Sequence, residues 1–154
     1  MSEPHRVLVW GFHPRFVDLN AGGHLDNVAV LRAIDEGRHR LLGVGEAGGP
    51  RLVSGLLDST PQAVMPMVVG HHINYVRELQ YAADPLEITA WVCRLGRTSF
   101  EVATEVRQGP RQEVAAIAVT AVVTVDTSTH APWVISEDLR ETLAAYAGPR
   151  PPVR

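Results

Sequence analysis

Apolar residues recur at the spacing of a helix between about residues 25 and 42. Leu25, Val28, Leu31, Ile34 and Leu41 are separated by three or seven positions, so they fall on one face of a helix. We therefore predict one long helix that buries this stripe of side chains against the rest of the fold.

The residues at both ends of this stripe favour the same helix. Asp26 and Asn27 stand where a side-chain oxygen can accept hydrogen bonds from the first helical turn. Arg38 and Arg40 lie in the last turns, where positive charge is favourable, and Gly43 follows as a typical C-terminal cap. The predicted helix therefore ends at about residue 42.

Most of the remaining chain shows the patterns of β-strands. The clearest alternation of apolar and charged residues runs from Phe100 to Arg107, as in a strand with one buried face. Residues 114–125 are apolar on both faces, which indicates an interior strand lying against a helix. We predict strands over residues 6–10, 63–76, 85–95, 100–107 and 114–125.

Two shorter segments and the C-terminal tail complete the prediction. Residues 52–57 form a short apolar piece within a stretch rich in glycine and proline, and we predict a helical turn there. A last helix, capped by Ser136, is predicted over residues 136–146. The proline-rich tail after about residue 147 is predicted to be loosely ordered.

These elements predict an α+β fold in which a curved antiparallel sheet packs against the long helix. The chain has 154 residues, a length that suits one domain, and its sequence shows neither a repeat nor a linker. We therefore expect a single domain over residues 1–154.

Composition and charge exclude several classes of function. With a net charge of −3, the chain offers no general attraction to nucleic acid or to an anionic membrane. All 14 basic residues are arginines, which excludes chemistry that needs a lysine amine. The longest apolar run, residues 114–125, is too short to cross a bilayer, and no secretory leader pattern precedes the first strand. We expect a cytoplasmic protein without nucleic-acid or membrane partners.

Neither a cofactor nor a metal ion is predicted. Residues 43–48 spell G-x-G-x-x-G, but they follow a helix, whereas the dinucleotide-binding fingerprint follows a strand and opens a helix. His71 and His72 are neighbours on a predicted strand, so their side chains point to opposite faces and do not suit one metal ion. Cys93 is the only cysteine, which excludes thiolate clusters, and we expect it to be a buried packing residue.

One polar segment stands out because it directly precedes the long helix. Between Arg15 and Asn27 it contains two acids, two amides, a histidine and a pair of glycines. As an ordinary loop, the segment would only cap the helix. As a site, it would let a ligand approach the backbone at the glycines, and the first N–H groups of the helix would stabilise a developing oxyanion.

This segment resembles a signature of the hotdog-fold acyl-CoA thioesterases of the 4-hydroxybenzoyl-CoA thioesterase type, which reads R-x-x-D-x-D-x-x-G-H-V-N-N. The residues at the matching places are Arg15, Asp18, Asn20, Gly23, His24, Leu25, Asp26 and Asn27. The resemblance continues through residues 72–75, 84–88 and 94–99, and it covers roughly residues 6–126 in the right order.

The resemblance implies a hotdog fold, with five or six antiparallel strands wrapped around the central helix, in a homodimer that is often doubled to a homotetramer. It implies an acyl-CoA or acyl-carrier-protein substrate at the subunit interface, so that coenzyme A is part of the substrate and no separate cofactor is needed. It assigns Gly23 and Asn27 to substrate binding. Arg97, Thr98 and Ser99 would contact the phosphate or pantetheine of CoA, although they also suit an ordinary polar hairpin turn.

The implied reaction is hydrolysis of the thioester to free acid and thiol, with backbone N–H groups near Gly23 and His24, at the start of the helix, stabilising the oxyanion. Asn20 stands where the family usually has the catalytic aspartate, and an amide is no base at pH 7. With Asn20 and His24 at the reaction centre, Asn20 would orient the water or thioester while another group takes the proton. The nearest candidates for that group are Asp18, His24 and Asp26, with Glu36 more remote.

Other functions stay open at this point. A slow hydrolase would rely on oxyanion stabilisation and positioning alone. A non-hydrolytic accessory protein would bind acyl thioesters without cleaving them, an alternative that Asn20 favours. A hotdog dehydratase would use His24 or His72 together with an acid across the interface, and it ranks last because the segment before the helix resembles that of thioesterases.

Overall fold

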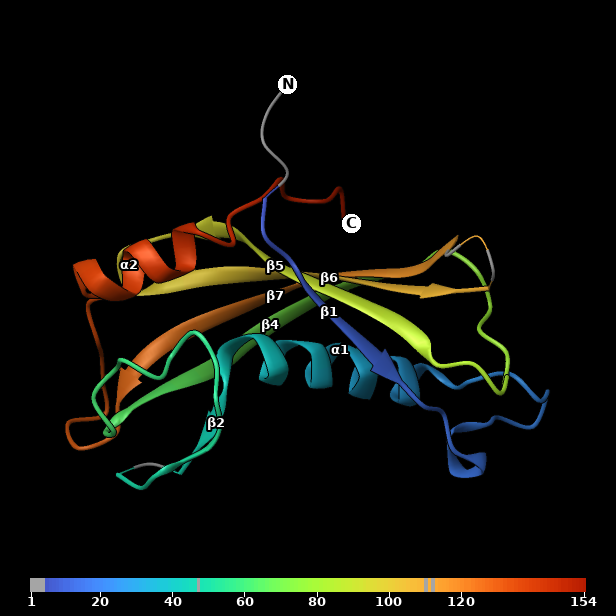
Figure 1. Ribbon diagram of the computed structural model, residues 1–154, viewed down its shortest axis with the longest axis horizontal. Helices are drawn as coiled ribbons and strands as arrows, with labels where there is room; N and C mark the ends of the chain where they lie inside the picture. The colour runs from blue at the N-terminus through green and yellow to red at the C-terminus, as the bar shows by residue number, and fades with distance from the viewer. Residues whose placement is uncertain (1–4, 47, 110, 112) are drawn as a thin grey trace.

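The computed structural model describes residues 5–46, 48–109, 111 and 113–154, and it shows a curved sheet with one long helix along its inner face (Figure 1). A short second helix lies near one end of the sheet (Figure 1). The elements, in chain order, are β1 (Leu8–Phe12), η1 (Phe16–Asp18), α1 (Asn27–Leu42), β2 (Val44–Gly45), β3 (Arg51–Val53), β4 (Val64–Tyr75), β5 (Leu86–Leu95), β6 (Ser99–Gln108), β7 (Glu113–Asp126), β8 (Ala131–Pro132) and α2 (Glu137–Ala144).

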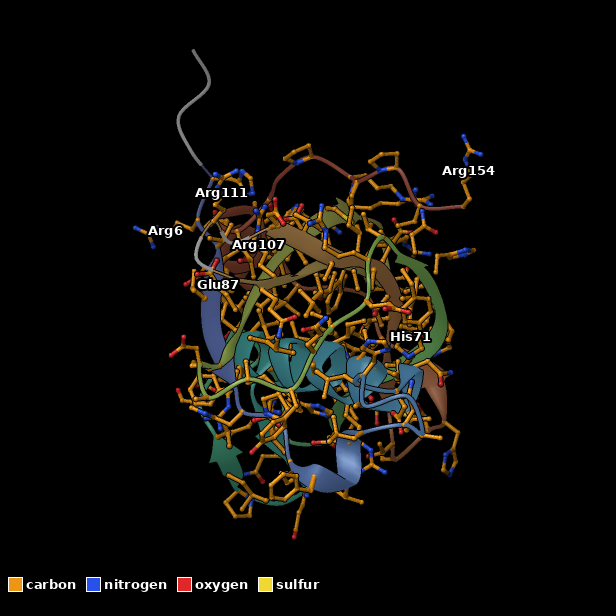
Figure 2. The ribbon with its side chains drawn as sticks, turned by 90° about the vertical axis from the view of Figure 1, so that its right-hand side faces the viewer. Arg6, His71, Glu87, Arg107, Arg111 and Arg154 are labelled. Atoms are coloured by element: carbon orange, nitrogen blue, oxygen red, sulfur yellow. The ribbon has the colours of Figure 1, made fainter. Side chains whose placement is uncertain are left out.

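The large sheet has the strand order β1-β5-β6-β7-β4, with β8 paired to β7, and every neighbouring pair is antiparallel. β7 is an interior strand, as its apolar sequence predicts. The sheet curves over α1, and Arg6, just before β1, and His71, on β4, lie at its opposite margins (Figure 2). An antiparallel sheet of this size wrapped around one long helix confirms the hotdog fold expected from the sequence.

The buried face of α1 is built from small residues as well as large ones. Ala29, Ala33 and Gly37 recur at intervals of four and are buried together with Ile34. A Cβ atom added at Gly37 would lie only 2.6 Å from the Cγ2 of Ile88 on β5, so the helix sits directly on the sheet at this point. The helix therefore packs more closely than a face of leucines would allow.

The stripe predicted from the sequence is wrong at one position. Val28 is 50% exposed, whereas its neighbours Ala29 and Val30 are buried. The spacing of large apolar residues missed the small residues of this face because alanine and glycine carry a weak hydrophobic signal. Both ends of the helix agree with the prediction, since Asp26 caps its start and Gly43, with φ +89°, caps its end.

Residues 52–57 form no helical turn, which corrects the sequence prediction. The first part of this segment belongs to β3, which pairs with β2 in a small two-stranded sheet. Leu57 follows in a turn and is buried, with its N–H donated to the C=O of Leu42 at the end of α1. The apolar residues of this segment thus cover the C-terminal end of α1.

The C-terminal tail is tied to the sheet, in contrast to the loosely ordered tail that composition predicts. The N–H of Val92 donates to the C=O of Tyr146 at 2.9 Å, and the N–H of Gly148 donates to the C=O of Val92 at 2.8 Å. The indole N–H of Trp91 donates to the C=O of Pro149 at 2.9 Å. Proline content marked a segment without regular structure, but it did not reveal that the segment docks on β5.

Neither helix within the described residues has the length and apolar character that crossing a membrane requires.

Candidate functional site at the start of the long helix

The loop before α1 is a tight turn that Asn20 holds together. The N–H of Asn20 donates to the C=O of His24 at 2.8 Å, and the N–H of Gly23 donates to the C=O of Asn20 at 3.1 Å. The side-chain Oδ1 of Asn20 accepts from the N–H groups of Gly22 and His24, at 2.9 and 3.2 Å. The N–H groups of Gly23 and His24, which the sequence suggested as oxyanion donors, are therefore already paired within the loop.

Asp18 stabilises the same loop through both its side chain and its backbone. Its carboxylate accepts the backbone N–H of Arg15 at 2.7 Å and forms an ion pair with the Arg15 guanidinium at 3.4 Å. Asp18 is buried, and its backbone C=O accepts the N–H of Asp26 at 2.9 Å. These contacts give Asp18 a structural task at the entry to the helix.

The first turn of α1 leaves two N–H groups open. The Oδ1 of Asp26 accepts the N–H of Ala29 at 2.6 Å, and the backbone C=O of Asp26 accepts the N–H of Val30 at 3.2 Å. Within the described part of the chain, the N–H groups of Asn27 and Val28 have no acceptor. Unpaired N–H groups at the start of a helix carry partial positive charge and favour a negatively charged oxygen.

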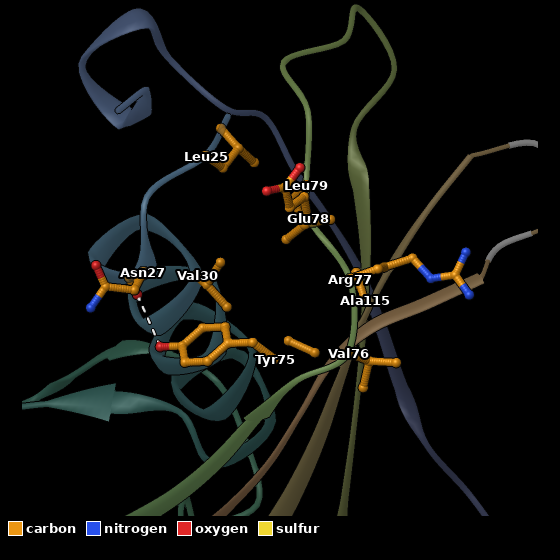
Figure 3. A pocket seen from close by; sticks show the side chains of 10 residues that line it. Leu25, Asn27, Val30, Tyr75, Val76, Arg77, Glu78, Leu79 and Ala115 are labelled. Carbon is orange, nitrogen blue, oxygen red and sulfur yellow. Dashed lines mark hydrogen bonds between the residues drawn. The ribbon is translucent and has the colours of Figure 1, made fainter. Parts of the chain in front are cut away.

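A cavity of about 310 Å³ opens beside this helix start, between α1 and the end of β4 (Figure 3). Its walls are mainly apolar. They are formed by Leu25, Asn27, Val30, Tyr75, Val76, Arg77, Glu78, Leu79, Ala115 and Ala116. The cavity volume is at the lower end of the roughly 300–1,000 Å³ typical of small-molecule sites.

A few polar groups gather at the rim of this cavity. The hydroxyl of Tyr75 donates to the backbone C=O of Asn27 at 3.5 Å (Figure 3). The Nε2 of His24 lies 3.3 Å from the Oε2 of Glu78, which is itself a wall residue. The arrangement combines an apolar chamber, open N–H groups and a histidine–carboxylate pair, which are the parts that acyl transfer to water requires.

Glu78 is a residue that the sequence analysis missed. It lies in the segment between β4 and β5, next to Arg77, and no motif marks it. Only the folded chain shows that Glu78 contacts His24, which is far away in the sequence. An isolated β-bridge between His24 and Gln80 brings the two segments together. A search for carboxylates near the polar segment could not have found it.

Arg97, Thr98 and Ser99 lie elsewhere in the same chain. They form the β5–β6 turn, where the N–H of Gly96 donates to the C=O of Ser99 at 2.7 Å. Ser99 pairs with Val123 of β7, seven residues along that strand from the cavity residue Ala116, a separation of roughly 23 Å at strand spacing. A single chain therefore does not bring these residues to its own cavity.

The two neighbouring histidines, His71 and His72, lie in β4. His71 is exposed on β4, and its Nδ1 lies 2.9 Å from the Oγ1 of Thr120, while His72 is also exposed. Across the described residues, no group of three or more histidine, cysteine or acidic side chains is placed to hold a metal ion.

The chain is similar to a known family in sequence and to known structures in fold. A profile of the thioesterase-like superfamily matches residues 14–143, most of the chain, including the whole site. No curated protein matches the sequence.

Similar folds occur in proteins described as thioesterases. A predicted thioesterase from Bacillus stearothermophilus has a TM-score of 0.76 at 20% identity, over 95% of this chain and 100% of that one. YbaW, a probable thioesterase from Escherichia coli, has a TM-score of 0.70 at 22% identity, over 92% and 98%. A thioesterase from Thermus thermophilus, in complex with coenzyme A and zinc, has a TM-score of 0.67 at 21% identity, over 91% and 98%. The structural similarity establishes the fold. The profile match establishes that the chain belongs to the thioesterase-like superfamily.

Proposed function

We propose that this protein hydrolyses acyl-CoA or acyl-carrier-protein thioesters to free acid and thiol. The observation that carries the proposal is the apolar cavity whose wall includes Asn27, the first residue of α1, with its open N–H group, in a chain of the thioesterase-like superfamily. The acyl group would occupy the cavity, with its carbonyl oxygen directed at the helix start.

The oxyanion donors in this proposal are the N–H groups of Asn27 and Val28. They replace those of Gly23 and His24, because both of these are paired within the loop. Removal of one oxyanion donor typically costs about 2.7–4 kcal/mol of transition-state stabilisation. Two donors at a helix start therefore account for a substantial part of the rate enhancement.

A homodimer would complete the substrate site. β4 pairs only with β7, so within the described sheet its other edge is free, and Met67 and Val69 on this strand are exposed. Free edges of this length are normally covered in native proteins. Antiparallel pairing of two β4 edges would bring Arg97 of the partner subunit to the end of the sheet that holds the cavity, where CoA phosphates would need a positive charge.

The proposal is tested by incubating the purified chain with short, medium, long and aromatic acyl-CoA thioesters and measuring release of free thiol. We expect turnover of at least one class, with kcat/KM above about 10⁴ M⁻¹s⁻¹, the lower range of enzymes on their own substrates. Binding of acyl-CoA without thiol release would instead support the accessory-protein function that Asn20 favours. Absence of both would contradict the proposal.

A further inference from the structure

We infer that Glu78 is the general base of this site and that His24 is the residue that positions it. The inference rests on the proposed thioester hydrolysis and supplies the group that the amide of Asn20 cannot provide, because a base must accept a proton at the working pH. The observation behind it is the joining of a cavity-wall carboxylate to a histidine of the loop before α1.

The surroundings of Glu78 leave its carboxylate available. Its neighbour Arg77 also lines the cavity, but its guanidinium points away and pairs with Glu113 on β7, so this charge does not neutralise Glu78 (Figure 3). The side chain of Glu78 is 74% exposed, and water reaches it freely. A carboxylate that borders both solvent and the acyl cavity can hold the attacking water beside the thioester carbon.

His24 is fixed on its other side, which allows it to hold Glu78 in place. Its backbone N–H donates to the side chain of Asn20, and its backbone C=O accepts the N–H of Asn20. The residue also pairs with Gln80, which brings the β4–β5 segment against the loop. Because Glu78 lines the cavity and His24 does not, we assign proton transfer to Glu78 and positioning to His24.

The other candidate carboxylates near α1 already have partners outside the cavity. Asp18 is buried against Arg15, and Asp26 caps the N–H of Ala29. These two line a different hollow, which Glu78 does not line. Glu36, the more remote candidate from the sequence, pairs with Arg40 at 3.3 Å in the same helix, and none of the three lines the cavity beside Asn27.

The step balances without any further reactant. Glu78 takes a proton from water as the water oxygen forms a bond to the thioester carbon, and the electron pair of the C=O moves to oxygen, facing the N–H groups of Asn27 and Val28. The tetrahedral intermediate then collapses, the C–S bond breaks, and the proton on Glu78 passes to the thiolate. The products are a carboxylic acid and a thiol, and Glu78 is again a carboxylate.

The test compares thiol release by the wild-type protein, Glu78→Gln and His24→Asn, with Glu141→Gln as a matched control on the exposed face of α2. We expect Glu78→Gln to lower kcat about 10²- to 10⁴-fold, the usual contribution of a general base, with KM changed less than threefold. His24→Asn should lower kcat about tenfold and shift the midpoint of the acid limb of the pH–rate profile. Glu78→Gln should lose that limb, and Glu141→Gln should match the wild type.

The outcomes separate this inference from the proposed function. If the wild-type protein hydrolyses thioesters and Glu78→Gln retains its kcat and its acid limb, the assignment of Glu78 is overturned while hydrolysis stands. If the wild-type protein releases no thiol from any acyl-CoA, the proposed function fails first. The circular dichroism spectrum and Tm of Glu78→Gln should equal those of the wild type, since the side chain is exposed, and a loss of kcat in a folded variant supports the assignment.

Discussion

Asn20 is a residue whose type is unfavourable for proton transfer but whose contacts suit another task. Its side-chain oxygen accepts two backbone N–H groups, from Gly22 and His24, and so determines the path of the loop before α1. Aspartate and asparagine both accept hydrogen bonds in this way. The amide at position 20 therefore has a structural task, and the proposed base is supplied from another segment.

Asn20→Ala should impair the protein, whereas Asn20→Asp should leave it nearly unchanged. Asn20→Ala removes the acceptor of two hydrogen bonds, each worth roughly 0.5–1.5 kcal/mol, and should lower Tm by a few degrees and kcat/KM about tenfold, because His24 loses the side-chain acceptor of its N–H. Asn20→Asp keeps the acceptor and should stay within threefold of the wild type. Thermal unfolding and thiol release measure both. A hundredfold acceleration by Asn20→Asp would mean that the base was missing from the wild type.

Cys93 should be nearly inert towards alkylation in the folded protein. Burial, helped by the nearby charge of Glu101, raises the pKa of the Cys93 thiol to about 11. At pH 8 such a thiol is about 0.1% thiolate, against roughly a quarter for an ordinary cysteine. We expect the rate of reaction with iodoacetamide to rise more than 100-fold when the protein is unfolded in urea. Equal rates in the two states would show that Cys93 is accessible and unperturbed.

At the residue scale, the sequence predicts groups that act on their immediate neighbours. The caps Asp26, Ser136 and Gly43 are correct, because a helix end is a local feature of the chain. Glu78 could not be predicted, since its importance depends on a contact with His24 that only the folded sheet creates. Motif spacing likewise gives no sign that the N–H of His24 is used inside its own loop.

At the scale of the elements, the packing of α1 on the sheet depends on small residues that allow the helix to approach β5 closely. Gly37 faces Ile88 with no room for a methyl group, although glycine within a helix normally lowers stability. The long strands could be predicted because their apolar residues alternate with charged ones, as in β6, or form an unbroken run, as in β7. The short strands β2 and β3 could not, because few residues carry their pattern and their pairing depends on the end of α1.

Gly37→Ala should destabilise the protein despite the better helix propensity of alanine. Overpacking of a buried contact typically costs about 1–3 kcal/mol, which exceeds the gain of about 1 kcal/mol from replacing glycine in a helix. The added Cβ would lie 2.6 Å from Ile88 Cγ2. We expect a net loss of about 1 kcal/mol in the free energy of unfolding, measured by urea denaturation.

Gly11→Ala on β1 is the matched control for this substitution. Its added Cβ would lie at an ordinary 3.4 Å from Pro85, so the same chemical change should leave the stability of the protein nearly unaltered. An increase in stability from Gly37→Ala equal to the full helix-propensity gain would show that α1 does not rest on β5 as described.

For the whole molecule, the free edge of β4 is the feature on which the proposed dimer depends. It lies at one margin of the sheet, next to the end of α1 that carries the cavity, since Tyr75 closes β4 and also lines the cavity (Figure 3). The sequence predicts the sheet wrapped around its helix through family resemblance. It does not predict which residues of one chain meet those of another.

Val69→Lys should weaken the proposed dimer, because a charged side chain on a strand edge opposes edge-to-edge pairing. Val69 is 65% exposed in the single chain, so the substitution should leave the fold intact. Light scattering after size exclusion should give about twice the 16.8 kDa chain mass for the wild type and a lower mass for the variant. Val134→Lys, also at an exposed valine, is the control. A wild-type protein that is monomeric and fully active would contradict the dimer.

Obstructing the cavity beside the helix start and measuring thiol release tests whether the acyl group lies there. Val76→Trp places a large ring at its rim, where the valine is 53% exposed and lines the wall, and Val134→Trp makes the same change at a 48% exposed valine outside it. We predict that kcat/KM for acyl-CoA hydrolysis falls at least tenfold in Val76→Trp and stays within twofold of the wild type in Val134→Trp. Equal kcat/KM values for the two variants would show that the acyl group does not lie in this cavity.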